Sequence, residues 1–219
     1  MNSNINASKL KTIFKTKRDE YNESMATRIH RAISWLAKAE AEEDDDAKLI
    51  FYWISFNAAY ADSLSEGLET REQFKLFMQK LLKQDTQQHI HAMLFSEFNG
   101  AIRTLISNKY IYAPFWQAQR NRNSSSDAWQ KNHSNSIKVA TSALLSKDTI
   151  TMLSIIFDRL YVLRNQLVHG GATWQSKINR QQVSDGSKML GTIVPALIAL
   201  LLDSASVDFG DIMYPVISS

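Results

Sequence analysis

The amino-acid sequence predicts an all-α fold, and three observations support this prediction. Only 7 glycines and 3 prolines interrupt the 219 residues, which is too few for a turn-rich β fold. Apolar residues recur at intervals of three and four in several segments, the period of a helix with one buried face. Hydrophobic residues make up 44% of the chain and charged residues 21%, as in ordinary globular proteins. At this length we expect a single domain over residues 1–219.

Four helices are predicted in the N-terminal half, after a start that allows two interpretations. Residues 1–20 are rich in lysine and poor in apolar side chains, so they form either a short helix or a mobile arm. Helical periodicity begins at Met25, and the acidic run 42–46 should form the connection and the negative first turn of the next helix. Residues 48–64 are apolar nearly all round the helical wheel, which places that helix in the middle of a bundle. Thr70 begins the following helix with capping-box spacing.

One polar stretch separates the predicted helices of the C-terminal half. The fourth helix runs from about residue 85 to 106, and residues 117–136 are then expected to form a long basic loop. Trp116 directly precedes that loop and Trp129 lies within it, where they could stack on nucleic-acid bases. Packing of both tryptophans against the bundle is the favoured interpretation. Three more helices are predicted over residues 137–145, 148–169 and 181–202.

The residue inventory argues against several classes of site and against a membrane partner. Cysteine is absent, which excludes disulfides, thiolate zinc sites and a thiol nucleophile. No convincing metal-ligand set is present, so we expect neither metal nor cofactor. The N-terminus has no apolar run that would serve as a signal peptide. The most apolar segment, residues 193–202, is shorter than the roughly 20 residues of a membrane span. A soluble, cytoplasmic protein is expected.

Positive charge is concentrated in the second half of the sequence. The formal net charge is +3, yet the balance is −2 through Glu97 and +5 from Phe98 onward. Between Phe98 and Lys147 the only acidic residue is Asp127, against seven basic ones. Such a surface can attract phosphates, although a solvated positive face without a partner fits equally well. The candidate RNA contacts in the polar stretch are Arg120, Arg122 and Lys131.

Residues 148–173 carry the side chains that suggest a chemistry. On a helical wheel one side collects the apolar residues Met152, Ile156, Leu160, Leu163 and Leu167. The opposite side collects Asp158, Asn165 and His169, with Val162 beside them and Arg164 on a flank. Gly170 and Gly171 follow at once and should end the helix. Two structural alternatives remain open: His169 as a favourable cation at the helix C-terminus, and Arg164 as an ordinary surface arginine.

The segment Arg164-Asn165-Gln166-Leu167-Val168-His169 resembles the Arg-Asn-x-x-x-His signature of HEPN domains (higher eukaryotes and prokaryotes nucleotide-binding). The glycine that follows and the late position in a helical chain also suit that family. The motif covers six residues, and at the level of fold the resemblance extends over about residues 24–202. It implies a HEPN-like helical bundle. The extra helices and the long basic loop make the chain similar to the larger abortive-infection-type members.

The resemblance also implies a function. Many HEPN domains are metal-independent endoribonucleases, often homodimers in which arginine and histidine from two protomers converge on RNA. In this chain His169 would take the proton of the RNA 2′-hydroxyl, Arg164 would stabilise the charged phosphorane, and Asn165 would orient the ring or the phosphate. The expected role is a toxin or phage-defence effector, with an antitoxin protein as a further partner.

Two alternatives to this enzyme remain open, namely a non-catalytic nucleotide- or RNA-binding HEPN module and a helical interaction protein. We also expect the row of Asp158, Val162, Asn165 and His169 to lie at or beside a dimer cleft. The reason is that Ile155 and Val162 are apolar residues that a solvated face has little reason to display.

Overall fold

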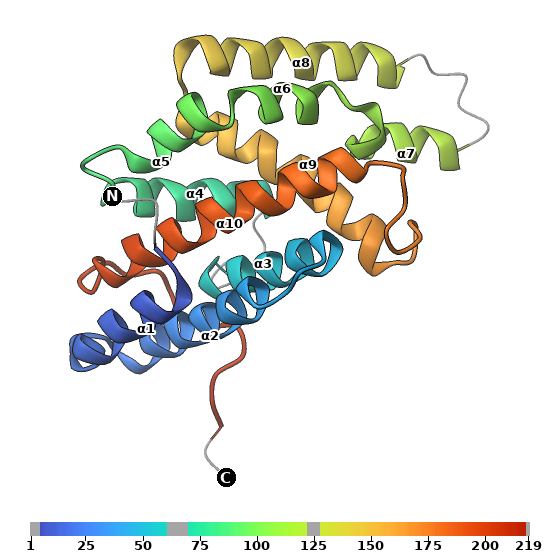
Figure 1. Cartoon of the computed structure of the whole chain (residues 1–219). Helices are drawn as coiled ribbons and strands as arrows, with labels where there is room; N and C mark the ends of the chain where they lie inside the picture. The colour runs from blue at the N-terminus through green and yellow to red at the C-terminus, as the bar shows by residue number, and fades with distance from the viewer. Residues whose placement is uncertain (1–4, 61–69, 122–127, 218–219) are drawn as a thin grey trace. The chain divides into compact units, whose positions relative to one another are not determined.

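The computed structural model describes residues 5–60, 70–121 and 128–217, and every regular element in these ranges is a helix (Figure 1). The all-α prediction is therefore confirmed. The α-helices are α1 (Ala7–Thr16), α2 (Glu23–Glu40), α3 (Asp45–Tyr60), α4 (Thr70–Leu82), α5 (His89–Ala92), α6 (Asn99–Ser107), α7 (Ala113–Arg120), α8 (Ala128–Ser146), α9 (Thr149–Val168) and α10 (Arg180–Leu202). Three short helical turns join them: η1 (Arg18–Glu20), η2 (Met93–Glu97) and η3 (Lys109–Ile111).

The chain divides into two compact units. Unit 1 consists of Met1–Ile90 and Ser187–Ser219, and unit 2 consists of His91–Gly186. Helix α10 contributes its first residues to unit 2 and the rest to unit 1. Unit 2 carries eleven lysines and arginines and five aspartates and glutamates, a net charge of +6. The single domain expected over residues 1–219 stays a prediction.

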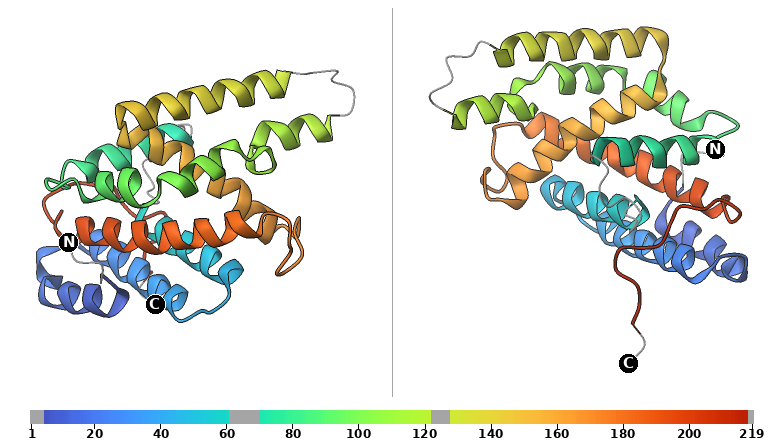
Figure 2. Two further views of the ribbon diagram at one scale, coloured as in Figure 1. Left: turned by 45° about the horizontal axis from the view of Figure 1, so that its top comes forward. Right: turned by 180° about the vertical axis from the view of Figure 1, so that it is seen from behind.

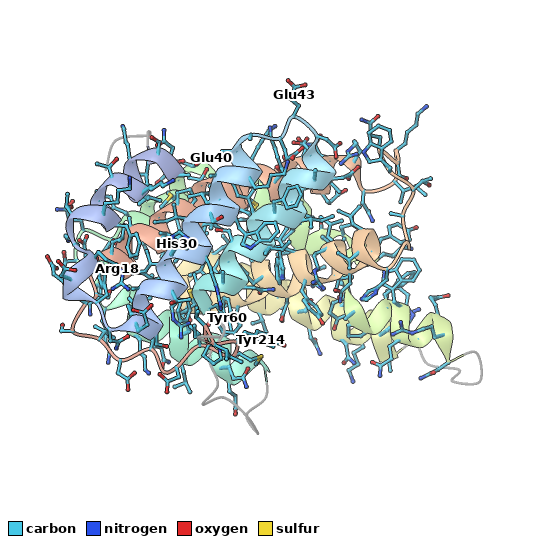
Figure 3. All side chains as sticks on the ribbon, turned by 90° about the horizontal axis from the view of Figure 1, so that it is seen from below. Arg18, His30, Glu40, Glu43, Tyr60 and Tyr214 are labelled. Atoms are coloured by element: carbon cyan, nitrogen blue, oxygen red, sulfur yellow. The ribbon has the colours of Figure 1, made fainter. Side chains whose placement is uncertain are left out.

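In unit 1, α2 packs against α3 and α1 packs on α2. Leu10 and Phe14 of α1 are buried, and the backbone N–H of Ala7 donates to both carboxylate oxygens of Glu40 at 3.1 Å. The short-helix interpretation of the N-terminal segment is therefore confirmed over Ala7–Thr16. Figure 3 shows His30 and Glu40 along α2.

The acidic run begins α3, as predicted. Asp44 accepts the backbone N–H of Ala47 at 3.0 Å, and Asp45 and Asp46 lie in the first turn. Carboxylates there interact favourably with the positive end of the helix dipole. Glu43 projects outward from the connection between α2 and α3 (Figure 3).

Helix α10 is a core helix of the described chain. Among the described helices it alone is long and apolar enough to cross a bilayer, but 78% of its apolar window is buried inside the protein. Gly191 allows a close approach, because a Cβ there would lie only 3.0 Å from the hydroxyl oxygen of Tyr52 on α3. The most buried side chains of α10 are Met189, Leu190, Ile193, Val194, Leu197, Ile198, Leu201 and Leu202.

A buried arginine fixes the segment that follows α10. Arg28 on α2 is 0% exposed. Its guanidinium donates to the carbonyl oxygens of Ala59 at 2.9 Å, Phe209 at 3.3 Å and Gly210 at 3.0 Å. One side chain thus joins α2, the end of α3 and the C-terminal segment. The apolar periodicity of the sequence gives no sign of this role.

Two sequence predictions about element boundaries are wrong. Residues 85–106 do not form one helix: α5 begins only at His89, because Asp85 accepts the backbone N–H groups of His89 and Ile90 at 2.8 Å. A π-helical turn, η2, and the non-helical Phe98 then precede α6. The expected long loop over 117–136 is helical at both ends, in α7 and α8, and residues 122–127 lie outside the described part of the chain.

Aromatic contacts explain why the polar stretch of unit 2 forms helix. The ring of Trp129 in α8 packs edge-on against Phe115 in α7, with centroids 5.0 Å apart. The indole N–H of Trp116 donates to the carbonyl oxygen of Tyr110 at 2.7 Å. Packing within the protein is therefore confirmed for Trp129, whereas Trp116 is held by its neighbours but remains 38% exposed. Figure 2 shows α6 and α7 following one another along α8, and α9 contacts both α6 and α8.

Candidate functional site

Helix α9 begins and ends at the signals that the sequence carries. The side chain of Asp148 accepts the backbone N–H of Thr151 at 3.0 Å, which caps the first turn. At the other end the N–H of His169 donates to the carbonyl of Asn165 at 3.0 Å, and Gly170 adopts the left-handed region with a φ of +67°. The N–H of Gly170 bonds to the carbonyl of Leu167 at 3.2 Å, as in glycine-terminated helices. His169 is therefore the C-cap residue.

The two glycines Gly170 and Gly100 should respond to alanine in opposite directions. Gly170→Ala is expected to lower the free energy of unfolding by about 1 kcal/mol, because an L side chain is strained at its positive φ. Gly100→Ala in α6 should raise it by about 0.5 kcal/mol, because alanine favours helix and the site is open. Urea unfolding of both variants measures this. Equal shifts would contradict the assigned helix end.

Arg164, Asn165 and His169 lie in the last turns of α9 and at its C-cap. The guanidinium of Arg164 donates from Nη1 to the side-chain oxygen of Asn165 at 2.9 Å, and both side chains are half-buried. His169 is exposed, and no described side chain holds its ring. The structure thus joins Arg164 to Asn165, whereas the sequence had allowed Asn165 to orient the histidine.

The wider polar row expected on α9 is only partly open to solvent. Val162 is only 9% exposed and Ile155 is half-buried, so the predicted apolar residues of that row are already covered within the chain. The expectation that Val162 is displayed is wrong, because α9 contacts α6, α8 and η3 and so is packed on more than its apolar stripe. The apolar side chains that remain exposed beside Arg164 and Asn165 are Tyr161 and Val168.

A second arginine of α9 is buried in unit 2. The guanidinium of Arg159 lies 4.3 Å above the ring of Tyr112 and donates to the hydroxyl of Ser136 at 2.8 Å. His133 of α8 contacts the same ring, with centroids 5.1 Å apart. Burial lowers the pKa of His133, and the nearby positive charge of Arg159 lowers it further. The periodicity of the sequence gives no sign of this cluster, because Arg159 falls between the two faces of the helical wheel.

Stability should depend on pH through His133. Because its folded-state pKa lies below its unfolded value of about 6.5, the unfolded chain binds more protons as pH falls below that value. The contribution of His133 to stability is therefore complete above pH 6.5 and declines at lower pH, down to the folded-state pKa. Urea unfolding of the wild type and of His133→Gln between pH 5 and 7.5 measures this. If the free energy of unfolding depended on pH as steeply in His133→Gln as in the wild type, His133 would not be the source of the dependence.

The candidate RNA contacts of the polar stretch fall at one end of the α7–α8 pair. Arg120 is the last residue of α7 and Lys131 lies in the first turn of α8, and both are exposed. These helices pack together, as the contact between Phe115 and Trp129 shows. Arg122 lies outside the described residues.

Over residues 5–60, 70–121 and 128–217, no cluster of three or more histidine, aspartate or glutamate side chains is placed to hold a metal ion. The chain matches no protein-family model, and neither a curated protein nor a solved structure is significantly similar to it.

Proposed function

We propose that this protein is a metal-independent endoribonuclease of HEPN type. The observation that carries the proposal is the position of three side chains at the end of α9: Arg164 bonded to Asn165, and the exposed His169 one turn further on. The asparagine holds one edge of the guanidinium, which leaves further N–H donors for a phosphate. The net charge of +6 in unit 2 supports an anionic substrate.

The chemistry follows from these groups. His169, as the neutral imidazole, takes the proton of a ribose 2′-hydroxyl, and the freed oxygen attacks the adjacent phosphorus. Arg164 stabilises the negative charge of the phosphorane by paired hydrogen bonds. The bond from phosphorus to the 5′-oxygen then breaks, and that oxygen takes a proton from an acid or from water. The products are a 2′,3′-cyclic phosphate and a 5′-hydroxyl end.

The biological setting of the proposal is a toxin or phage-defence effector that works as a cytoplasmic homodimer, with an antitoxin protein as a further partner. The exposed Tyr161 and Val168 are the apolar side chains that a second protomer would cover. Light scattering tests the dimer, and a monomer at all workable concentrations would contradict it.

One observation favours a second function, a binding module without turnover. The ring of His169 is held by no described side chain, whereas a general base is normally oriented by a partner. In this alternative the Arg164 and His169 face binds RNA or a nucleotide and leaves it intact.

Incubation of the purified protein with mixed cellular RNA in a chelator separates the two functions. The enzyme should produce 2′,3′-cyclic phosphate ends, and His169→Ala should not. DNA and RNA methylated at the 2′ oxygen should resist cleavage, because the internal nucleophile is missing or blocked. Binding of RNA at full strength without any cleavage would favour the binding module.

The basic residues of the α7–α8 region should contribute to RNA binding by charge. Replacing Arg120, Arg122 and Lys131 together by glutamine should weaken binding and reduce the slope of log Kd against log salt by up to about 2, since fewer counterions are released. Glutamine at the exposed lysines 9, 11 and 15 of α1 is the matched control. An unchanged slope in the first variant would show that its three residues do not contact RNA.

A further inference from the structure

Two exposed aromatic rings in unit 2 are held in a fixed arrangement. Tyr110 in η3 is 43% exposed and Trp116 in α7 is 38% exposed. Both rings meet the buried Phe115 edge-on, with centroid distances of 5.5 Å and 5.1 Å. The indole N–H of Trp116 also bonds to the carbonyl oxygen of Tyr110 at 2.7 Å. The pair is therefore rigid although it faces solvent.

The same carbonyl ties this aromatic pair to α9. Gln166 donates from Nε2 to the carbonyl oxygen of Tyr110 at 2.7 Å. Asn179 donates to the side-chain oxygen of Gln166 at 3.1 Å and accepts a bond of 3.1 Å from Asn108. Gln166 precedes His169 by three residues, which on a helix is about 60° of rotation and about 4.5 Å of rise. Tyr110 is thus anchored to the turn of α9 that ends at His169.

Positive charge accompanies the rings. The ammonium group of Lys109 lies 5.1 Å from the ring centroid of Tyr110 and 5.9 Å from that of Phe115. Arg120 follows Trp116 by four residues, which places both on one side of α7. Exposed aromatic rings interleaved with cations are the combination that proteins use to hold single-stranded nucleic acid, since each base has a face for stacking and each phosphate a negative charge.

We propose that Tyr110 and Trp116 form a stacking platform for unpaired bases of an RNA strand that reaches Arg164 and His169. This inference deepens the proposed ribonuclease function and rests on it. It defines the substrate as single-stranded RNA, because the bases of an A-form duplex are stacked on one another and their faces are closed to side chains.

The test measures RNA affinity without turnover, in the His169→Ala protein with a chelator present. The probes are a fluorescein-labelled, unstructured 12-nucleotide RNA and the same strand in a duplex, followed by anisotropy. Tyr110→Ala and Trp116→Ala should each bind the single strand roughly 5- to 100-fold more weakly, the usual effect of losing one stacked base. Their affinity for the duplex should stay unchanged. Tyr110→Phe and Trp116→Phe should retain most of the single-strand affinity, because a ring remains.

The matched control is Trp35→Ala in unit 1. Trp35 is also 38% exposed and also stacks on a phenylalanine, Phe51, at 5.8 Å. It should leave RNA affinity unchanged. If the His169→Ala protein, with Tyr110 and Trp116 intact, bound the single strand and the duplex equally well, the proposal would be overturned. So would a loss in Trp116→Phe as large as in Trp116→Ala, because the indole hydrogen bond would then account for the effect.

Failure of this inference is distinguishable from failure of the proposed function. If the wild type cleaves RNA in chelator while the Tyr110 and Trp116 variants bind normally, the platform is wrong and the ribonuclease stands. If the platform variants lose single-strand binding while the wild type never cleaves, the platform stands and the protein is a binding module.

Discussion

Replacing His169 by alanine is expected to lower the rate of RNA cleavage by roughly two to four orders of magnitude, the usual effect of removing a positioned base. Arg164→Ala should lose a similar factor, because the phosphorane would lose its charge-stabilising group. The double variant should be little worse than either single one, since both groups act on one transition state. Single-turnover cleavage of a labelled RNA in chelator measures all three rates.

A matched control for the arginine exists within unit 2. Arg103 on α6 is exposed and bonds to the side-chain oxygen of Asn99 at 2.8 Å, much as Arg164 bonds to Asn165. Arg103→Ala should cleave RNA at the wild-type rate. All these variants should unfold at nearly the same urea concentration as the wild type, since His169 is exposed and neither arginine is part of the apolar core. Products with 5′-phosphate ends formed only with magnesium would refute the mechanism.

The ends of α9 illustrate what the sequence predicts well. Its cap, Asp148, and its terminating Gly170 act through backbone atoms within four residues, so local sequence contains the whole signal. The helix bounds Thr149–Val168 accordingly differ from the predicted 148–169 by one residue at each end. The spacing of Asn165 and His169 then fixes their common face, because helical geometry alone decides it, and it leaves Arg164 on a flank.

The N-terminal part of α8 illustrates what local sequence does not contain. Its first residues are polar and look like a loop, yet Trp129 packs on Phe115, fourteen positions earlier in the chain. The contact between Gln166 and the backbone of Tyr110 spans 56 positions. Neither contact has a periodic signature, so both the helical start of α8 and the aromatic pair beside the candidate site require the three-dimensional structure.

Buried arginines are a further kind of residue whose position the apolar periodicity of the sequence does not predict. Arg28 and Arg159 are charged residues, a type that is rarely buried, but their partners are backbone carbonyls, a hydroxyl and an aromatic ring brought together by folding. Their burial depends on these acceptors, which lie 23 to 182 positions away along the chain. The energetic consequence is largest for Arg28.

Arg28→Ala is expected to lower the free energy of unfolding by about 3–5 kcal/mol. The change leaves a cavity in a fully buried position and removes the donors to the carbonyls of Ala59, Phe209 and Gly210. Arg28→Met fills most of the volume but cannot donate, so its loss should be about 2–3 kcal/mol. The loss of stability in Arg28→Met measures the missing hydrogen bonds, and the additional loss in Arg28→Ala measures the missing packing. Either loss is a large share of the roughly 5–15 kcal/mol that stabilise a typical domain.

Arg31, three residues further along α2, provides the control for Arg28. It bonds to the carbonyl of Tyr214 at 2.6 Å but is only half-buried, so Arg31→Ala should cost less than about 1 kcal/mol. Urea unfolding compares the three variants. Limited proteolysis should cut Arg28→Ala earlier than the wild type within residues 209–217, because Arg28 holds the start of that segment. If Arg28→Ala and Arg31→Ala unfolded at the same urea concentration, the buried guanidinium would not be what fixes the C-terminal segment to α2.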